Sequence, residues 1–260
     1  MLTKILMGIG FIAVFLPTFL IGGKLLEAVV AIVVVAASYE IAGLRDESKA
    51  NWPMTILTAA AVIVMGRVPS DRVWVYSGVW LILLFVILIA DSSVSADQIV
   101  YVYTMSVITA FASRAILGIY QCGMGWAGAL FTALACYVCD TGAYFFGSFF
   151  GKHKMIPRIS PNKTWEGAIG GYAVAALVSI LFGLFATDKI PQGLVITAGL
   201  ILPAVAEIGD LAFSSIKRRW GMKDFGRIFP EHGGILDRID SLLFCLIVFS
   251  FLMVHWGFAI

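Results

Sequence analysis

Charged residues are scarce in this chain of 260 residues, where Asp, Glu, Lys and Arg together fill 13% of the positions. Soluble domains carry about 25% charged residues. A globular chain so poor in them could not cover its own surface with polar groups. Hydrophobic residues make up 60% of the sequence, and the mean hydropathy is +0.96. The composition excludes an ordinary soluble domain and predicts an integral membrane protein.

Cysteine is also scarce, with four residues at Cys122, Cys136, Cys139 and Cys245. Two of them form a CxxC pair, but the pair lies in an apolar stretch without the further partners that a zinc or redox site needs. We therefore interpret the four as small packing residues. The start of the chain lacks a small-x-small cleavage site, so the apolar run after Lys4 is predicted to be a first membrane span rather than a signal peptide.

Long apolar runs are what the chain has in abundance. A spanning helix needs about 20 apolar residues, or fewer if it is short or distorted. The third of the candidate runs is short, and the fifth is interrupted by Ser106, Thr109 and Arg114. We predict an all-α polytopic membrane protein of about nine transmembrane helices. The predicted spans are 5–22, 25–44, 53–66, 73–90, 99–118, 124–149, 168–186, 191–212 and 241–259.

Positive charges are unevenly distributed between the two sides of these spans. With the N-terminus in the cytoplasm, 13 of the 18 Lys and Arg residues fall on the cytoplasmic side, four fall on the opposite side, and Arg114 falls inside a span. Cytoplasmic connections are the ones that carry excess Lys and Arg, which supports this orientation. Two cytoplasmic connections are long and polar, 150–167 and 213–240, and the second contains the charged stretch KDFGRIFPEHGGILDRID.

Acids in or beside the apolar runs are costly in a membrane and are therefore candidates for a functional site. Asp140 ends one run, Glu207 and Asp210 lie three residues apart in another, and Asp237 and Asp240 repeat that spacing. Residues three apart share a face of a helix. Each acid could simply pair with an Arg or cap a helix. Alternatively, the acids bind a divalent cation while nearby Lys and Arg bind phosphates, which is what phosphoryl or nucleotidyl transfer requires.

The charged stretch also contains His232 followed by Gly233 and Gly234. Glycines let the backbone approach a ligand closely, although a Gly-Gly pair can also be an ordinary turn. The histidine could donate to a phosphate or assist a proton transfer, or it could be a solvated loop residue. The sequence leaves these alternatives open.

The other polar connection ends in SPNKTWEG, residues 160–167. Thr164 is predicted to cap a helix that begins near Trp165. Lys163 would then lie beside a helix N-terminus, which is a natural anion site. The basic residues of this connection could also be topology signals or contacts to anionic headgroups.

These stretches resemble the phosphatidate cytidylyltransferases, also called CDP-diacylglycerol synthases. The family signature matches SSIKRRWGMKDFGRIFPEHGGILDRID, residues 214–240, and the stretches CDTGAYFFG, GKHKMIPRISPNKTWEG and EIGDLAFSSIKR are also similar. The first 120 residues match only as generic spans. The fixed positions of the signature are filled by Ser214, Lys217, Arg218, Lys223, Asp224, Gly226, Pro230, His232, Gly233, Gly234, Asp237, Arg238 and Asp240.

The resemblance implies a reaction of CTP with phosphatidic acid that gives CDP-diacylglycerol and pyrophosphate, with Mg²⁺ as cofactor. It implies Asp210 and Asp237 as metal carboxylates, with Asp140 and Asp240 as further ligands or orienting groups. The implied phosphate-binding and catalytic residues are Lys217, Arg218, Lys223, Arg238 and His232. The implied substrate-binding residues are Asn162, Lys163, Thr164, Ser214, Asp224, Gly233 and Gly234.

The resemblance further implies a second, monovalent cation such as K⁺, and a homodimer. We expect a multi-pass protein of the bacterial inner membrane, with residues 1–120 as N-terminal spans and residues 121–260 as the catalytic region of a single membrane domain. A polar cavity should open to the cytoplasm, because CTP is cytoplasmic, and sideways into the inner leaflet, where phosphatidic acid keeps its tails. No nucleic-acid partner is expected.

Three other functions compete with this one. A CTP-dependent polyprenol kinase would transfer the γ-phosphate to an alcohol. A CDP-alcohol phosphotransferase is disfavoured because the sequence has no DGxxAR motif followed by spaced aspartates. An ion-coupled transporter would use the acids for its ions, but such folds often show internal repeats, and none is evident here.

Overall fold

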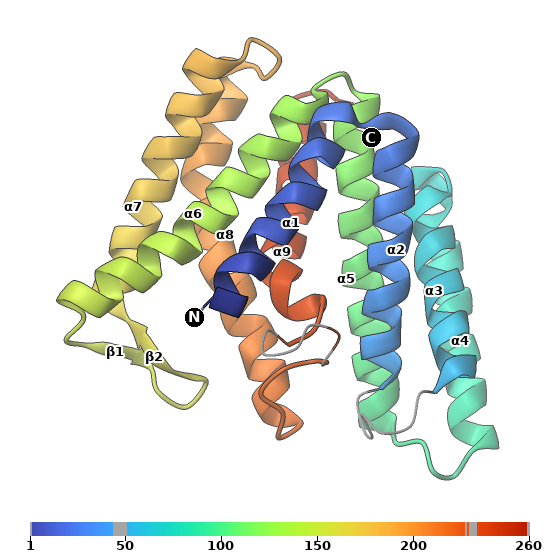
Figure 1. Cartoon of the computed structure of the whole chain (residues 1–260). Helices are drawn as coiled ribbons and strands as arrows, with labels where there is room; N and C mark the ends of the chain where they lie inside the picture. The colour runs from blue at the N-terminus through green and yellow to red at the C-terminus, as the bar shows by residue number, and fades with distance from the viewer. Residues whose placement is uncertain (1, 44–50, 227, 229–232, 259–260) are drawn as a thin grey trace. The chain divides into compact units, whose positions relative to one another are not determined.

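The computed structural model describes residues 2–43, 51–226, 228 and 233–258, and most of this part is helical (Figure 1). Its α-helices are α1 Leu2–Ile21, α2 Gly23–Ala42, α3 Trp52–Arg67, α4 Val73–Ala90, α5 Ala96–Gln121, α6 Gly125–Phe150, α7 Trp165–Leu181, α8 Gln192–Arg219 and α9 Leu236–His255. A 3₁₀ turn, Ser70–Arg72, precedes α4, and a π-helical turn, Phe182–Ala186, ends α7.

The prediction of an all-α polytopic membrane protein is confirmed. Within the described residues, seven helical segments are long and apolar enough to cross a membrane, and α3 is a shorter apolar helix. The seven are Gly23–Ala42, Ser70–Ala90, Ala96–Gln121, Gly125–Phe150, Trp165–Ala186, Gln192–Arg219 and Leu236–His255. The number of nine spans stays a prediction.

Several helices extend beyond the apolar runs that predicted them. α8 continues to Arg219 instead of ending at 212, and α9 begins at Leu236 instead of 241. The connection between them is therefore shorter than the predicted 213–240. A span predicted from apolar residues ends at the first cluster of charged residues. The helix itself can continue through charged residues, because its backbone hydrogen bonds do not depend on hydropathy.

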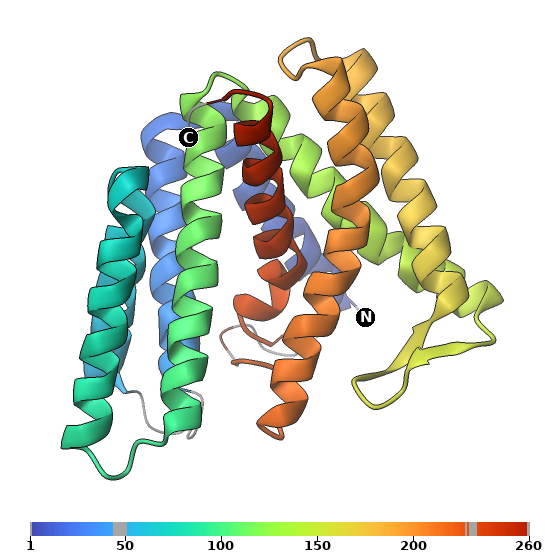
Figure 2. The same ribbon diagram turned by 180° about the vertical axis from the view of Figure 1, so that it is seen from behind.

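The polar connection between α6 and α7 contains a feature that the sequence analysis missed, a β-hairpin. Its strands are β1 Lys154–Ile156 and β2 Ser160–Thr164, and they pair antiparallel with Lys154 opposite Thr164 and Ile156 opposite Ser160. Figures 1 and 2 show the hairpin beyond the ends of α6 and α7. Ser160, Pro161 and Asn162 belong to residue types that favour turns, yet they lie in β2.

Contacts divide the chain into two compact units, which we describe separately. The first unit comprises Met1–Gly23, Ala115–Lys223 and Ile239–Ile260, and the second comprises Lys24–Arg114 and Asp224–Arg238. The first unit thus holds α1, α6, α7, α8, the hairpin and most of α9. The second holds α2, α3, α4, most of α5 and the segment that leads into α9.

In the first unit, α6 and α7 pack closely because glycines line their contact, and α8 lies along α7 (Figure 2). A Cβ atom added at Gly171 would lie 2.5 Å from the Cys139 carbonyl oxygen and 2.6 Å from the Ala143 nitrogen. One added at Gly142 would lie 2.9 Å from the Gly171 Cα. Small residues let the backbones of membrane helices approach in this way.

In the second unit, the polar residues that interrupted the fifth predicted span are accommodated within one continuous helix, α5. Ser106 Oγ donates to the Val102 carbonyl at 2.6 Å, and Thr109 Oγ1 donates to the Met105 carbonyl at 2.8 Å. Arg114 donates to the Val68 carbonyl and to Ser70 Oγ, both at 2.5 Å. Buried polar groups need such partners in a membrane, and here neighbouring backbone provides most of them.

Candidate active site

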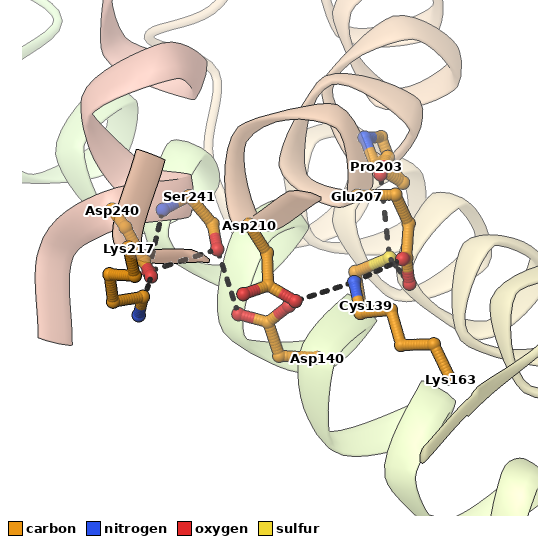
Figure 3. A network of polar contacts seen from close by, with 9 residues as sticks. All are labelled: Cys139, Asp140, Lys163, Pro203, Glu207, Asp210, Lys217, Asp240 and Ser241. Atoms are coloured by element: carbon orange, nitrogen blue, oxygen red, sulfur yellow. Dashed lines mark hydrogen bonds and ion pairs between the residues drawn. The ribbon is translucent and has the colours of Figure 1, made fainter. Parts of the chain in front are cut away.

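Lys163 lies at the centre of a polar cluster in the first unit (Figure 3). Its Nζ atom is 2.6 Å from Glu207 Oε2 and 2.6 Å from Asp210 Oδ2, so one ammonium group bridges two carboxyl groups. The two acids lie one helical turn apart on α8 and present their side chains on the same face, as their spacing predicted. The Lys163 side chain is 18% exposed, so the pair is largely shielded from water.

Local structure fixes the position of this lysine. Thr164 is the N-cap of α7, and its Oγ1 accepts a hydrogen bond from the Gly167 N–H at 3.2 Å, which confirms the predicted cap. Thr164 is both the last residue of β2 and the N-cap of α7. Lys163, the residue before it, is therefore held where the strand meets the helix. Lys163 lies beside a helix N-terminus as predicted, but its ammonium group is directed to the acids of α8.

The charges around Lys163 determine its protonation. Burial by itself would lower the pKa of the Lys163 ammonium group, but the neighbouring charges of Asp210 and Glu207 and their hydrogen bonds outweigh that effect and raise the pKa above its ordinary value. The lysine is therefore a permanent cation at physiological pH.

A second part of the cluster lies around the start of α9. Lys217 Nζ is 3.9 Å from Asp240 Oδ2, and both side chains are largely buried. Ser241 Oγ donates to Asp140 Oδ2 at 3.3 Å, and the Ser241 N–H donates to Asp240 Oδ1 at 2.9 Å. Ser241 therefore links the acid of α6 to the acid of α9. The Asp140 carboxyl group also lies next to that of Asp210 (Figure 3).

The predicted metal ligand Asp237 is in the second unit, in the first turn of α9. Its Oδ2 accepts hydrogen bonds from the Phe225 N–H at 2.8 Å and the Gly234 N–H at 2.9 Å. This carboxyl group therefore connects Phe225 and Gly234 to the first turn of α9. Gly233 has a φ of +77°, a conformation that favours glycine, so its place in the signature has a backbone cause.

The structure locates the other predicted site residues as follows. Arg218 is exposed at the end of α8, where it donates to the carbonyls of Ile159 and Met222 at 3.3 and 2.9 Å. Asn162 is exposed on β2, and Ser214 is half-buried in α8. Lys223 and Asp224 lie in the connection before α9, and Arg238 lies in its first turn. His232 lies outside the described residues.

Ser241 and Glu40 contact predicted site residues or the backbone beside them, but neither was assigned to the predicted site. Nothing in the sequence marks Ser241, because serine is common in membrane helices. Glu40 could have been found, since it is an acid inside the apolar run VVVAASYEIA and such acids are functional candidates. Glu207 was noted as an acid but not assigned a role, and it proves to be a partner of Lys163.

The donor set is compatible with a hard divalent cation. Among the residues that the structure describes, no three His, Cys, Asp or Glu side chains are grouped as a ready-made metal site. Mg²⁺ does not require one, because it commonly binds one or two carboxylates together with the phosphates of a substrate. Asp140, Asp210 and Asp240 offer carboxyl oxygens of the kind that Mg²⁺ prefers. In the buried CxxC pair, Cys139 Sγ donates to the Pro203 carbonyl at 3.4 Å and to Glu207 Oε1 at 3.8 Å.

The second unit has an apolar groove of about 590 Å³ on the α2 side. It is lined by Ala31, Ile32, Val35, Ala36, Tyr39, Trp52 and Ile228. None of these lining residues is charged, so the described part of the groove differs from the polar cavity that the sequence predicted. That cavity stays a prediction.

Comparison with known proteins identifies the family. The sequence profile described as "Cytidylyltransferase family" matches residues 2–256. The chain belongs to the cytidylyltransferase family. It is 34% identical over 256 residues to the phosphatidate cytidylyltransferase of Staphylococcus saprophyticus, and 32% identical over 257 residues to that of Staphylococcus aureus. Each alignment covers 93% of this chain and 95% of the relative.

Membership of the cytidylyltransferase family makes the chain an enzyme, a nucleotidyltransferase, and confirms the resemblance found in the sequence. The seven apolar helices and the bacterial relatives make it a multi-pass membrane protein of the bacterial type. The profile match begins at residue 2, so it includes the first spans as well as the signature region.

Proposed function

We propose that this cytidylyltransferase uses CTP and phosphatidic acid to make CDP-diacylglycerol and pyrophosphate. The observation that carries the proposal is the largely buried cluster around Lys163, Glu207 and Asp210, beside apolar helices in a chain that aligns almost fully with phosphatidate cytidylyltransferases. A site with both signs of charge among membrane helices suits a substrate that is part nucleotide and part lipid.

In the proposed reaction, a phosphate oxygen of phosphatidic acid attacks the α-phosphorus of CTP. The bond between that phosphorus and the bridging oxygen breaks, and pyrophosphate leaves with the bond's electron pair. The attacking phosphate is already anionic near neutral pH, since its second pKa is about 6, so no strong general base is needed. The obstacle is the repulsion between two polyanions, which cationic groups must offset.

The composition of the cluster supports a divalent cation. It brings four acids, Asp140, Glu207, Asp210 and Asp240, together with the cations Lys163 and Lys217, and a divalent cation is a further partner suited to so many carboxyl groups. We infer that Asp140, Asp210 and Asp240 hold Mg²⁺, and we assign Asp237, in the second unit, to metal binding on the signature alone. When bound, the ion would neutralise charge on the triphosphate and the leaving pyrophosphate. A monovalent cation such as K⁺ is a further part of this proposal.

The chain's own cations have separate tasks. Lys163 keeps Glu207 and Asp210 in place, and Lys217 does the same for Asp240. Arg218 is exposed and bound only through backbone carbonyls in the contacts given above, so its guanidinium group can turn to a phosphate. We assign Lys223, Arg238 and His232 to substrate binding on the signature alone. The cytoplasmic orientation of the site and a homodimeric state also belong to the proposal.

The decisive test uses pure protein in detergent micelles that contain phosphatidic acid, with CTP labelled at either the α- or the γ-phosphate. We expect Mg²⁺-dependent transfer of the α label to lipid and release of the γ label as pyrophosphate. Transfer of the γ label to a lipid alcohol would instead identify a polyprenol kinase. Solute movement across vesicles without any CDP-lipid would favour a transporter.

A further inference from the structure

Glu40 is a buried acid that the proposed chemistry does not use. It lies near the end of α2, where 3% of its surface is exposed. It is outside the signature stretch of residues 214–240. All of the contacts described below are within the second unit. They connect α2 to the segment that leads into α9.

The two carboxyl oxygens of Glu40 each accept a backbone hydrogen bond. Oε1 accepts from the Ile235 N–H at 2.7 Å, and Oε2 accepts from the Leu236 N–H at 2.9 Å. Leu236 is the first residue of α9, and the first N–H groups of a helix have no partner within that helix. Glu40 therefore caps α9 from a position 195 residues earlier in the chain.

The same carboxyl group explains two glycines of the signature. A Cβ atom added at Gly234 would lie 2.3 Å from Glu40 Oε1, and one added at Gly226 would lie 2.8 Å from the same atom. At both glycines the three nearest atoms all belong to Glu40. Neither glycine has a positive φ, so the backbone itself would accept another residue. The need for glycine at these two positions comes from the presence of Glu40.

Gly234 connects Glu40 to the predicted metal ligand. Its Cα lies against Glu40, while its N–H donates to Asp237 Oδ2 at 2.9 Å. The cap on Ile235 and Leu236 fixes the first turn of α9, in which Asp237 lies. The position of the Asp237 carboxyl group therefore depends on Glu40 through both the helix start and the glycine segment.

We propose that Glu40 is a positioning residue for nucleotidyl transfer, which holds the Gly234–Leu236 segment so that Asp237 points in the direction that metal and nucleotide binding require. This inference rests on the proposed function, because it takes Asp237 as a metal ligand. Glu40 is proposed to act through the backbone N–H groups that it binds and not through contact with the substrate. Residues that orient metal ligands typically affect metal affinity or activity by about 10- to 100-fold.

The main test compares Glu40→Gln with Glu27→Gln, an exposed acid on the same helix. An amide has a single acceptor oxygen, so Glu40→Gln places a donor against one of the two backbone N–H groups. In purified, monodisperse protein, we expect kcat to fall by about 10-fold or more and half-saturation by Mg²⁺ to require a several-fold higher concentration. Glu27→Gln should match the wild type in kcat and in the Mg²⁺ concentration needed for half-saturation.

A purely structural role would predict a different pattern. The folded fraction of Glu40→Gln would fall, while the Mg²⁺ dependence of the remaining activity would stay unchanged. That result, or full activity in Glu40→Gln, would overturn the proposal.

A second test does not depend on turnover. Gly234→Ala should lower the melting temperature, because its methyl group meets the Glu40 carboxyl group. Adding Glu40→Asp, which is one methylene shorter, should restore part of that loss, whereas adding Glu27→Asp should not. Equal melting of Gly234→Ala and wild type would overturn the packing on which the proposal depends. If the wild type made no CDP-lipid, the proposed function would fail, and this test would still decide whether Glu40 holds the segment.

Discussion

Lys163 shows at the scale of a single residue how the polar cluster is stabilised. Its ammonium group lies 2.6 Å from each of two acids, Glu207, which is largely buried, and Asp210, which is partly exposed. Breaking a buried ion pair by removing one partner typically costs about 3–5 kcal/mol, because the other partner is left charged and uncompensated. Removing this lysine leaves two such partners, so its loss should affect stability as well as activity.

We expect Lys163→Met to lower the free energy of unfolding by about 3 kcal/mol or more, and the double variant Lys163→Met/Glu207→Gln to recover part of it. Lys152→Met, an exposed lysine of the same connection, is the matched control. Thermal unfolding in detergent measures all three. Equal melting temperatures for the Lys163 and Lys152 variants would contradict the buried pair.

The raised pKa of Lys163 determines how the difference in melting temperature between the wild type and Lys163→Met depends on pH. A group whose pKa is raised on folding contributes its full stability below its unfolded pKa, about 10.4 for lysine, and loses it as the pH rises through the folded value. The melting difference between wild type and Lys163→Met should therefore be constant from about pH 7 to about pH 9. A decline within this range would show that the lysine loses its proton earlier than the geometry implies.

Asp237 allows the effect of its charge on activity to be separated from its effect on structure. The backbone N–H groups of Phe225 and Gly234 donate to its Oδ2 and need only an oxygen atom as acceptor. Asp237→Asn retains such an oxygen but loses the negative charge. We expect CDP-lipid formation to fall by about 100-fold or more while the protein inserts, extracts and melts normally. Asp71→Asn, an exposed acid, should remain fully active. Full activity in Asp237→Asn would remove this residue from the metal site.

At the scale of elements, the α6–α7 contact determines how closely two functional segments approach. α6 carries Asp140, and α7 begins at Trp165, two residues after Lys163. Because Gly142 and Gly171 leave the two backbones in contact, there is no space for even a methyl group between them. The helices can therefore bring a strand residue and a mid-helix acid into one cluster.

We expect Gly171→Ala to destabilise the protein by about 1–3 kcal/mol, since overpacking forces backbone shifts of this cost. Gly78→Ala in α4 is the matched control, because a Cβ atom there meets nothing within 4 Å. Alanine in a helix is about 0.5–1 kcal/mol more favourable than glycine, so the control should melt at or above the wild-type temperature. If both variants melted alike, the close α6–α7 approach would be wrong.

The sequence predicted helices well but their ends poorly, for a physical reason. Apolar length determines whether a segment can cross a membrane, so α4 was predicted with its observed ends at residues 73 and 90. Hydropathy does not determine where hydrogen bonding ends, so the last two turns of α8 were missed. The hairpin was missed because its five-residue strand contains proline and asparagine, which favour turns.

The site was predictable where a charge stood out against an apolar background. Asp140, Asp210 and Lys163 were named in advance, and the structure brings them into one cluster. The sequence could not show that Lys163 would pair with Glu207 from 44 residues away, because partners are chosen by helix packing. For the same reason, nothing local connected Glu40 to the glycines of the signature.

At the scale of the whole molecule, the distribution of Lys and Arg predicts which connections face the cytoplasm. We expect a cysteine at Asp188, between α7 and α8, to react with a membrane-impermeant maleimide in intact bacterial cells. A cysteine at Arg158, in the hairpin, should react only after the membrane is opened. Both sites are exposed, and Cys122 should first be replaced because it is half-buried and free. The opposite labelling pattern would invert the proposed orientation.

The length of α8 determines the depth at which the enzyme meets its lipid. At 1.5 Å per residue, its 28 residues extend about 42 Å, whereas the hydrocarbon core of a bilayer is about 30 Å thick. Asp210 then lies about 27 Å from the Gln192 end, near the far boundary of the hydrocarbon, and Lys217 to Arg219 lie about 10 Å beyond it. With the Gln192 end at one boundary of the hydrocarbon, Lys217 to Arg219 reach the level of the phospholipid phosphates. In the proposed reaction, phosphatidic acid would then react at its resting depth, without being lifted out of the leaflet.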